Sequence, residues 1–272
     1  MDALLVALTV LAMAVVAPVG LRLLRLPLPA QVAAVWPWAG LLAGAGLLAP
    51  RGGAAVLLCL PYAGLCVTDT AAGGLRALRV RPPADLVREL AALTAAASLT
   101  VAASALLAER AGVRLLGFDL GTLRLTVLHF HYAGFAAALL AGLTCAAVRT
   151  RAARWGAVAV PAGTLVVLAG FFLGEGAELL GAVVLAGGLL ATSWAVLRHG
   201  APRDTAGGRL LAVAALATPV TMALALWWAL GEASGLPHLS LAQTAATHGL
   251  ANALCVGLCG VLGWTLTTQE QL

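Results

Sequence analysis

Long runs of apolar residues, separated by short polar segments, dominate this chain. A helix needs about 20 predominantly apolar residues to cross the hydrocarbon core of a bilayer. Windows of that kind predict an all-α fold, a polytopic transmembrane helix bundle of about nine spans. The windows fall at 2–21, 30–49, 53–74, 85–108, 120–148, 155–173, 176–197, 208–230 and 240–267.

The third window is the least regular, because Pro61 and the run Thr68-Asp69-Thr70 interrupt it. The distribution of arginines between the loops tests the predicted number of spans. The loops after the first, third, fifth and seventh helices, with their flanks, hold 12 of them, and the alternate side holds 4. The positive-inside rule therefore predicts an N-terminus outside and a C-terminus in the cytoplasm. The segment at 79–83, RVRPP, is typical of a cytoplasmic loop.

Composition excludes a soluble protein, because 62% of the 272 residues are hydrophobic and only 10% are charged. We expect a single transmembrane domain over residues 1–272 in the bacterial inner membrane, with the lipid bilayer as its main partner. A net charge of +5 could suggest nucleic acid, but every basic residue is Arg and most lie in short loops. We therefore expect no nucleic-acid partner. The five cysteines lie in apolar runs and show no disulfide or zinc spacing.

Glycine pairs at close spacing recur in the predicted helices. Small residues let membrane helices approach one another, so we interpret these glycines as packing positions. The pairs are Gly40 with Gly44, Gly117 with Gly121, Gly170 with Gly174, and the set Gly257, Gly260 and Gly263.

The fifth window carries unusual polar residues for a membrane span: His129, His131 and Tyr132 lie in its middle. Ionisable residues inside a span are rare and usually functional. At 1.5 Å per residue, His129 lies roughly 13 Å from the predicted outer end, near mid-membrane. On an α-helix, residues two apart point about 200° apart, so His129 would share a face with Tyr132 while His131 faces the opposite way. A metal clamp from the two histidines is therefore not expected.

The ninth window has a polar stripe of its own. Thr244, His248, Asn252 and Cys255 follow the spacing of one α-helical face, and Asn252 could bind a carbonyl, a hydroxyl or an imidazole. His248 lies roughly 12 Å from the predicted outer end, so it and His129 reach a similar depth. The alternative is that these histidines only fix helix packing.

Acidic residues mark the predicted outer junction of the sixth and seventh helices. Glu175 and Glu178 are three residues apart and share a face if helical. They are either candidate acids or simply side chains favoured at a helix N-terminus. Glu232, His238 and Asp119 are interpreted as ordinary loop residues, and Asp69 as the one acid inside an apolar run near the cytoplasmic side.

Two motifs resemble a known family. HFHYAGF at 129–135, followed by an apolar stretch to 143, is similar to the signature of the YndJ-like bacterial membrane proteins. THGLANAL at 247–254 resembles that family's HGxxNALGF, with Cys255 and Val256 in place of the final Gly-Phe. The resemblance covers the chain from the fifth helix onward. It implies an integral membrane protein and says little about chemistry.

The preferred functional hypothesis is an intramembrane enzyme, a cofactor-free, acid-catalysed cyclase or isomerase of a prenylated or epoxidised terpenoid. A desolvated carboxylic acid can stay protonated and donate to an epoxide or alkene. By architecture only, this resembles small membrane-bound terpene cyclases. The candidate catalytic residues are Glu175, Glu178, His129, His131 and His248. The candidate substrate contacts are Tyr132, Asn252, Thr244, Phe135 and Trp228.

Two alternatives remain open at this point. One is a proton-coupled transporter or permease, which would need a polar path across the whole membrane. The other is a structural membrane protein whose polar residues lock helix packing. We expect no metal and no cofactor, and the sequence does not determine the oligomeric state.

Overall fold

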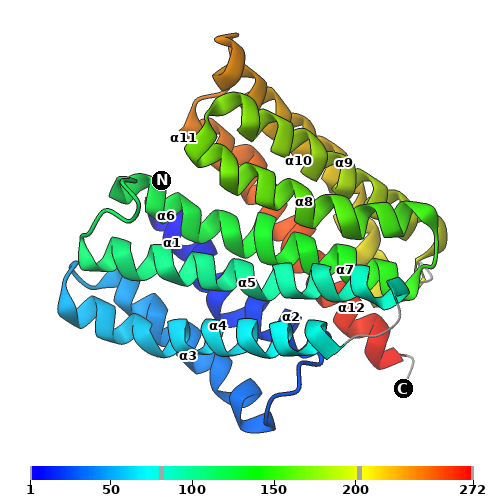
Figure 1. Ribbon diagram of the computed structural model, residues 1–272, viewed down its shortest axis with the longest axis horizontal. Helices are drawn as coiled ribbons and strands as arrows, with labels where there is room; N and C mark the ends of the chain where they lie inside the picture. Colours follow the sequence, from blue (N-terminus) through cyan, green and yellow to red (C-terminus); the bar gives the residue numbers. More distant parts are fainter. Residues whose placement is uncertain (1, 80–82, 201–203, 271–272) are drawn as a thin grey trace. The chain divides into compact units, whose positions relative to one another are not determined.

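The computed structural model describes residues 2–79, 83–200 and 204–270. Within these ranges every regular element is a helix, and nine helical segments are long and apolar enough to cross a membrane (Figure 1). This confirms the predicted all-α bundle and its number of spans. The segments are Ala3–Leu24, Ala30–Leu48, Gly53–Arg79, Leu86–Ala111, Leu120–Ala147, Arg151–Leu173, Glu175–His199, Ala206–Ser234 and Leu241–Gln269.

Six of these segments belong to single α-helices, and the other three contain π-helical turns. The single helices are α3 (Ala30–Leu48), α4 (Gly53–Arg79), α5 (Pro83–Ala111), α8 (Arg151–Leu173), α9 (Glu175–His199) and α10 (Ala206–Ser234). The first span joins α1 (Asp2–Leu11) to α2 (Ala17–Leu24) through the π-helical Ala12–Val16. The fifth joins α6 (Leu120–His129) to α7 (Ala137–Ala147) through the π-helical Phe130–Ala136. The ninth contains α11 (Leu241–Thr244), the π-helical Ala245–Gly249 and Asn252–Leu258, and α12 (Cys259–Glu270).

The irregular third window forms one continuous helix, α4. Pro61 lies in its interior, as prolines do in membrane helices when neighbouring groups satisfy the freed carbonyls. Thr70 also bonds to the next helix, because its Oγ1 lies 2.9 Å from the Ala96 carbonyl and 2.8 Å from Thr100 Oγ1 on α5. The third predicted span is therefore confirmed. Residues 80–82 of the predicted 79–83 loop lie outside the described residues.

Side-chain caps begin several of the helices. Asp119 Oδ1 accepts from the backbone N–H groups of Gly121 (2.8 Å) and Thr122 (3.0 Å) at the start of α6. Bonds from Thr122 and then Gly121 hold the pKa of the Asp119 carboxyl below its usual value. Thr150 and Thr205 cap α8 and α10 in the same way. Asp119 is therefore a capping residue, as its interpretation as a loop residue allows.

The chain divides into two compact units, residues 1–81 with 92–136 and residues 82–91 with 137–272. In the first, α3 packs against α4 and against the π-helical turn of the first span. In the second, α8 packs along α9, α9 along α10, and α10 along α12 (Figure 1). The single domain over 1–272 stays a prediction.

The contact between α8 and α9 is built on glycines seven residues apart. Gly156, Gly163 and Gly170 lie on α8, and Gly181 and Gly188 lie on α9. A Cβ at Gly163 would lie 2.7 Å from the Leu185 Cα, and one at Gly188 would lie 2.8 Å from the Val160 nitrogen. Such approaches let two backbones pack directly against each other, which is how helices associate in lipid.

The glycine pairs singled out in the sequence divide into two kinds. Gly40, Gly44, Gly170, Gly260 and Gly263 pack closely against neighbouring segments, as predicted. The packing interpretation is wrong for Gly117 and Gly174, which have positive φ and lie in turns, and for Gly121, which lies in the first turn of α6. A turn that needs positive φ selects glycine for its backbone freedom rather than its size.

An ion-pair cluster fixes one end of the first unit. The Glu109 side chain on α5 is only 1% exposed and accepts from Arg51 Nη2 at 2.7 Å and Arg110 Nη2 at 2.6 Å. Arg110 also donates to the carbonyls of Leu47 and Ala49, at the end of α3. The cluster therefore ties α3, α5 and the start of α4 together while satisfying carbonyls that a helix end leaves free.

Candidate functional site

His131 is the most completely enclosed ionisable residue of the fifth span. It lies in the π-helical Phe130–Ala136 and is 0% exposed. Its Nδ1 lies 2.6 Å from the Val127 carbonyl oxygen, and its Nε2 lies 2.5 Å from the Tyr62 hydroxyl. A carbonyl can only accept, so Nδ1 carries the hydrogen. A charged imidazolium is costly in this fully buried site, so Nε2 accepts from the phenol. The pair is therefore a neutral imidazole bonded to a neutral tyrosine.

Tyr62 connects this histidine to the other helices of the first unit. It projects from α4, is 0% exposed, and its ring stacks on His131 with centroids 5.9 Å apart. Trp36 on α3 packs edge-on against Tyr62, with ring centroids 5.3 Å apart. Three aromatic rings from three spans thus form one buried cluster, which we call the Tyr62 cluster: Trp36, Tyr62 and His131.

A buried carboxyl lies beside this cluster. Asp69 is seven residues after Tyr62 on the same face of α4 and is 1% exposed. The Trp36 indole N–H is close enough to influence the Asp69 carboxyl. Yet neither Trp36 Nε1 nor Asp69 Oδ2 has a hydrogen bond of normal geometry to any described residue. An ionised carboxylate with an unpartnered oxygen is costly in an apolar interior, so this site favours the protonated acid.

The π-helical turn changes which side chains face inward. His131 and Tyr132 are both buried, Phe135 is 0% exposed, and His129 is exposed. Tyr132 donates its hydroxyl to the Leu8 carbonyl at 3.0 Å in the first span. The α-helical phase argument, which grouped Tyr132 with His129, is therefore wrong here. A π-helix bonds i to i+5 instead of i+4, and this shifts the angular position of successive side chains.

The polar stripe of the ninth span lies in the second unit. His248 Nδ1 is 2.8 Å from the Thr221 carbonyl of α10, so this nitrogen carries the hydrogen. Asn252 Oδ1 and Thr244 Oγ1 are buried and find no hydrogen-bond partner in the described part of the chain. All three lie in or beside π-helical turns. His248 therefore bonds to a neighbouring helix, while Asn252 retains free bonding capacity.

The two candidate glutamates lie in the first turn of α9. Glu175 is exposed and Glu178 is half-buried. Glu232, at the end of α10, is near enough to the Glu178 carboxyl for an electrostatic interaction between the two acids. Glu232 also accepts from His238 Nε2 at 2.6 Å, and the Leu236 carbonyl lies 2.9 Å from His238 Nδ1. The bond to the Leu236 carbonyl and then the Glu232 carboxylate raise the pKa of His238, because both favour the imidazolium.

Trp228 of α10, a candidate substrate contact, is half-buried. Among the described residues, no group of three or more His, Cys, Asp or Glu side chains is placed to hold a metal ion. The structure thus places four candidates in the first unit: His129, His131, Tyr132 and Phe135. It places the other six in the second: His248, Asn252, Thr244, Glu175, Glu178 and Trp228.

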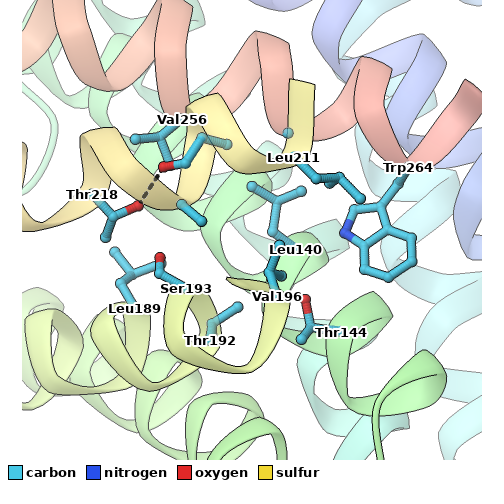
Figure 2. Close-up of a pocket in the computed structure, with 13 residues that line it drawn as sticks. Leu140, Thr144, Leu189, Thr192, Ser193, Val196, Leu211, Thr218, Val256 and Trp264 are labelled. Carbon is cyan, nitrogen blue, oxygen red and sulfur yellow. Dashed lines mark hydrogen bonds between the residues drawn. The ribbon is translucent and has the colours of Figure 1, made fainter. Parts of the chain in front are cut away.

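The second unit contains a small cavity of about 30 Å³, lined by parts of α7, α9, α10 and the ninth span (Figure 2). Its wall is apolar except for the Trp264 indole and the hydroxyl-bearing residues Thr144, Thr192, Ser193 and Thr218. One water molecule needs a cavity of about 10–15 Å³. The space therefore suits one or two waters and is too small for a terpenoid.

Sequence reasoning missed Tyr62 and Trp36. The signal for Tyr62 was present, because Tyr62, Cys66 and Asp69 follow i, i+4, i+7 spacing and form a polar stripe in an apolar window. Trp36 gave no such signal. Tryptophans near the ends of apolar windows are typical of the membrane interface, and only the tertiary structure shows this one to be 1% exposed.

The model of the YndJ-like protein family matches residues 7–256. The chain belongs to the YndJ-like family. The match extends well beyond the part from the fifth helix onward that the two motifs indicated, and it includes Trp36, Tyr62, Asp69 and His131. No curated protein and no solved structure matched this YndJ-like chain.

Proposed function

We propose that this YndJ-like protein is an intramembrane enzyme that cyclises or isomerises a lipid-soluble, terpenoid-type substrate by proton transfer. The observation that carries the proposal is the pairing of a neutral, fully buried His131 with Tyr62, beside the buried Asp69 carboxyl. General acid–base catalysis needs an acid that is protonated and a base that is free to accept, held apart from bulk water.

In this proposal Asp69 is the acid. It donates its proton to an epoxide oxygen or alkene carbon of the substrate, which becomes a carbocation. The rings of Trp36 and Tyr62 stabilise that cation through cation–π interaction. The cation then loses a proton to the Tyr62 oxygen while the phenol passes its own proton to His131 Nε2. Return of that proton to Asp69 closes the cycle, so product and substrate have the same mass.

Asp69 fits the role of a desolvated acid better than the glutamates first considered. Glu175 is exposed and Glu178 is only half-buried, so neither carboxyl is removed from water as completely as that of Asp69. Asp69 is 1% exposed and has an oxygen without a partner among the described residues. We also propose a bacterial inner-membrane location with the N-terminus outside, supported by the distribution of arginines.

The test uses membranes that contain the wild type, Asp69→Asn, Tyr62→Phe or Asp204→Asn. Asp204 lies exposed in the segment before α10 and serves as the matched control for loss of a carboxylate. Each membrane is incubated with a panel of epoxidised prenyl compounds, and products are identified by mass spectrometry and NMR. An isomer of unchanged mass, formed by wild type and control but lost in Asp69→Asn at equal expression, supports the proposal. Undiminished conversion by Asp69→Asn refutes the assignment of the acid.

A second candidate is proton-coupled transport. It is favoured by one observation: the ionisable side chains Asp69 and His131 are both buried in the first unit, near the Trp36 and Tyr62 rings. Purified protein in vesicles with an imposed pH gradient tests it. Solute-dependent proton flux that Asp69→Asn abolishes favours transport, and isomer formation without flux favours the enzyme.

A further inference from the structure

The cavity of the second unit contains a feature that the proposed function does not use. Thr144 on α7 is 0% exposed, and its Oγ1 has no hydrogen-bond partner within the described ranges. Figure 2 shows this hydroxyl on the side of α7 that faces the cavity, near Val196 and Leu140. Burying a hydroxyl without a hydrogen-bond partner destabilises the folded state. Native interiors normally satisfy such groups, by protein or by ordered water.

The other hydroxyls of the wall are arranged differently. Thr192 Oγ1 donates to the Gly188 carbonyl at 2.9 Å and lies against Gly156 of α8. Thr218 Oγ1 donates to the Ala214 carbonyl at 2.8 Å (Figure 2). Each of these oxygens keeps lone pairs that can accept. The cavity therefore offers the unpartnered Thr144 hydroxyl, the Thr218 oxygen, which can still accept a hydrogen bond, and the hydroxyl of Ser193.

Size and chemistry together select the ligand. A site that holds a water needs roughly 10–15 Å³ and two to four polar partners, whereas apolar cavities stay dry. This cavity measures about 30 Å³ and has four hydroxyl-bearing residues in its wall. Two of its lining residues, Thr144 and Val196, lie within one turn of the helix ends at Ala147 and His199, so water has a short route inward on that side.

We propose that this cavity binds one or two water molecules, held by Thr144 Oγ1 and the hydroxyl oxygens of α9 and α10. The water satisfies the Thr144 hydroxyl and bridges α7 to the two helices that pack around it. The bound water also explains why hydroxyl-bearing side chains occur where the apolar faces of α7, α9 and α10 meet, since these residues line the same small cavity.

The isosteric variant Thr144→Val distinguishes a wet from a dry cavity by the sign of its effect. In a dry cavity it removes an unpartnered hydroxyl and leaves the thermal unfolding midpoint unchanged or raised. In a wet cavity it takes a partner from the water and lowers that midpoint, by about 2–4 °C. Thr164→Val is the control, because Thr164 is buried on α8, donates to the Val160 carbonyl and does not line the cavity.

A second measurement reads the water itself. Protein in vesicles of a single synthetic phosphatidylcholine is equilibrated in H₂¹⁸O and exposed to a short X-ray pulse, and labelling of Trp264 in the cavity wall is followed by mass spectrometry. We expect ¹⁸O at Trp264 in the wild type and in Thr164→Val, and a loss of several-fold in Thr144→Val. Equal labelling of Trp264 in all three proteins would overturn the water site. So would a lower midpoint in Thr144→Val if native mass spectrometry showed a small alcohol, rather than water, bound to the wild type.

Discussion

The hydrogen bond between Tyr62 and His131 should be worth a measurable part of the stability of the first unit. Tyr62→Phe keeps the ring and its packing on Trp36 and removes only the hydroxyl. It leaves His131 Nε2 fully buried without a donor, in a site that is 0% exposed. The cost of an orphaned buried group is about 1–3 kcal/mol in soluble proteins.

Membrane proteins give smaller values, because the unfolded chain in lipid also finds partners. Interhelical bonds there average about 0.6 kcal/mol and reach about 1.7 kcal/mol. The 2.5 Å Tyr62–His131 contact joins two fully buried groups, so we expect a value at the upper end, about 1–2 kcal/mol.

A double-mutant cycle isolates this energy from the loss of ring packing. Tyr62→Phe is measured in the wild type and in His131→Leu, with the free energy of unfolding taken from denaturant titration in mixed micelles. Replacing both partners by apolar groups should be nearly neutral for the pair, so Tyr62→Phe should cost little in the His131→Leu background. A coupling energy below about 0.3 kcal/mol would refute the assignment of the bond.

Three further predictions concern other parts of the molecule. Gly188→Ala should destabilise the α8–α9 contact by about 1–3 kcal/mol through overpacking, whereas Gly187→Ala, whose Cβ would meet no described atom within 4 Å, should be neutral or slightly stabilising in the same unfolding assay. His238 has a raised pKa, so its contribution to stability should be complete below the ordinary value of 6.5 and should fade as pH rises through the raised pKa. A Glu232→Gln variant should shrink that pH dependence of the unfolding midpoint. Glu109→Gln should cost on the order of 3 kcal/mol in denaturant titration, because it strips a buried ion-pair cluster of its only described carboxylate, and wild-type stability would contradict this.

The bundle could be predicted from sequence because lipid imposes one rule on the whole chain. A span in hydrocarbon must satisfy its own backbone, so each apolar window of sufficient length becomes a helix, even where Pro61 interrupts it. Such a rule needs no tertiary information. It fixes the ends of the spans to within a few residues, as the agreement at Ala30–Leu48 and Arg151–Leu173 shows.

The site was harder to predict, because it depends on the angular position of side chains around their helices and on contacts between helices. His131 was singled out as an ionisable residue inside a span, and its burial agrees with that interpretation. The partner Tyr62 is 69 residues away in the chain, and no periodicity within one helix can show a contact with another. The burial of Tyr132 depends on the π-helical turn, which the 3.6-residue period does not anticipate.

The π-helical turn at Phe130–Ala136 also bears on how this span can change in length. Each i to i+5 bond encloses one residue more than an α-helical bond, so the turn holds a local surplus of one residue between two regular helices. Deleting one residue there would let α6 and α7 join as a continuous α-helix with both ends in register. The same deletion inside α8 or α9 would rotate every later side chain by about 100°. The segment that carries His131 is thus the place in its span where chain length can change with least disturbance to either end.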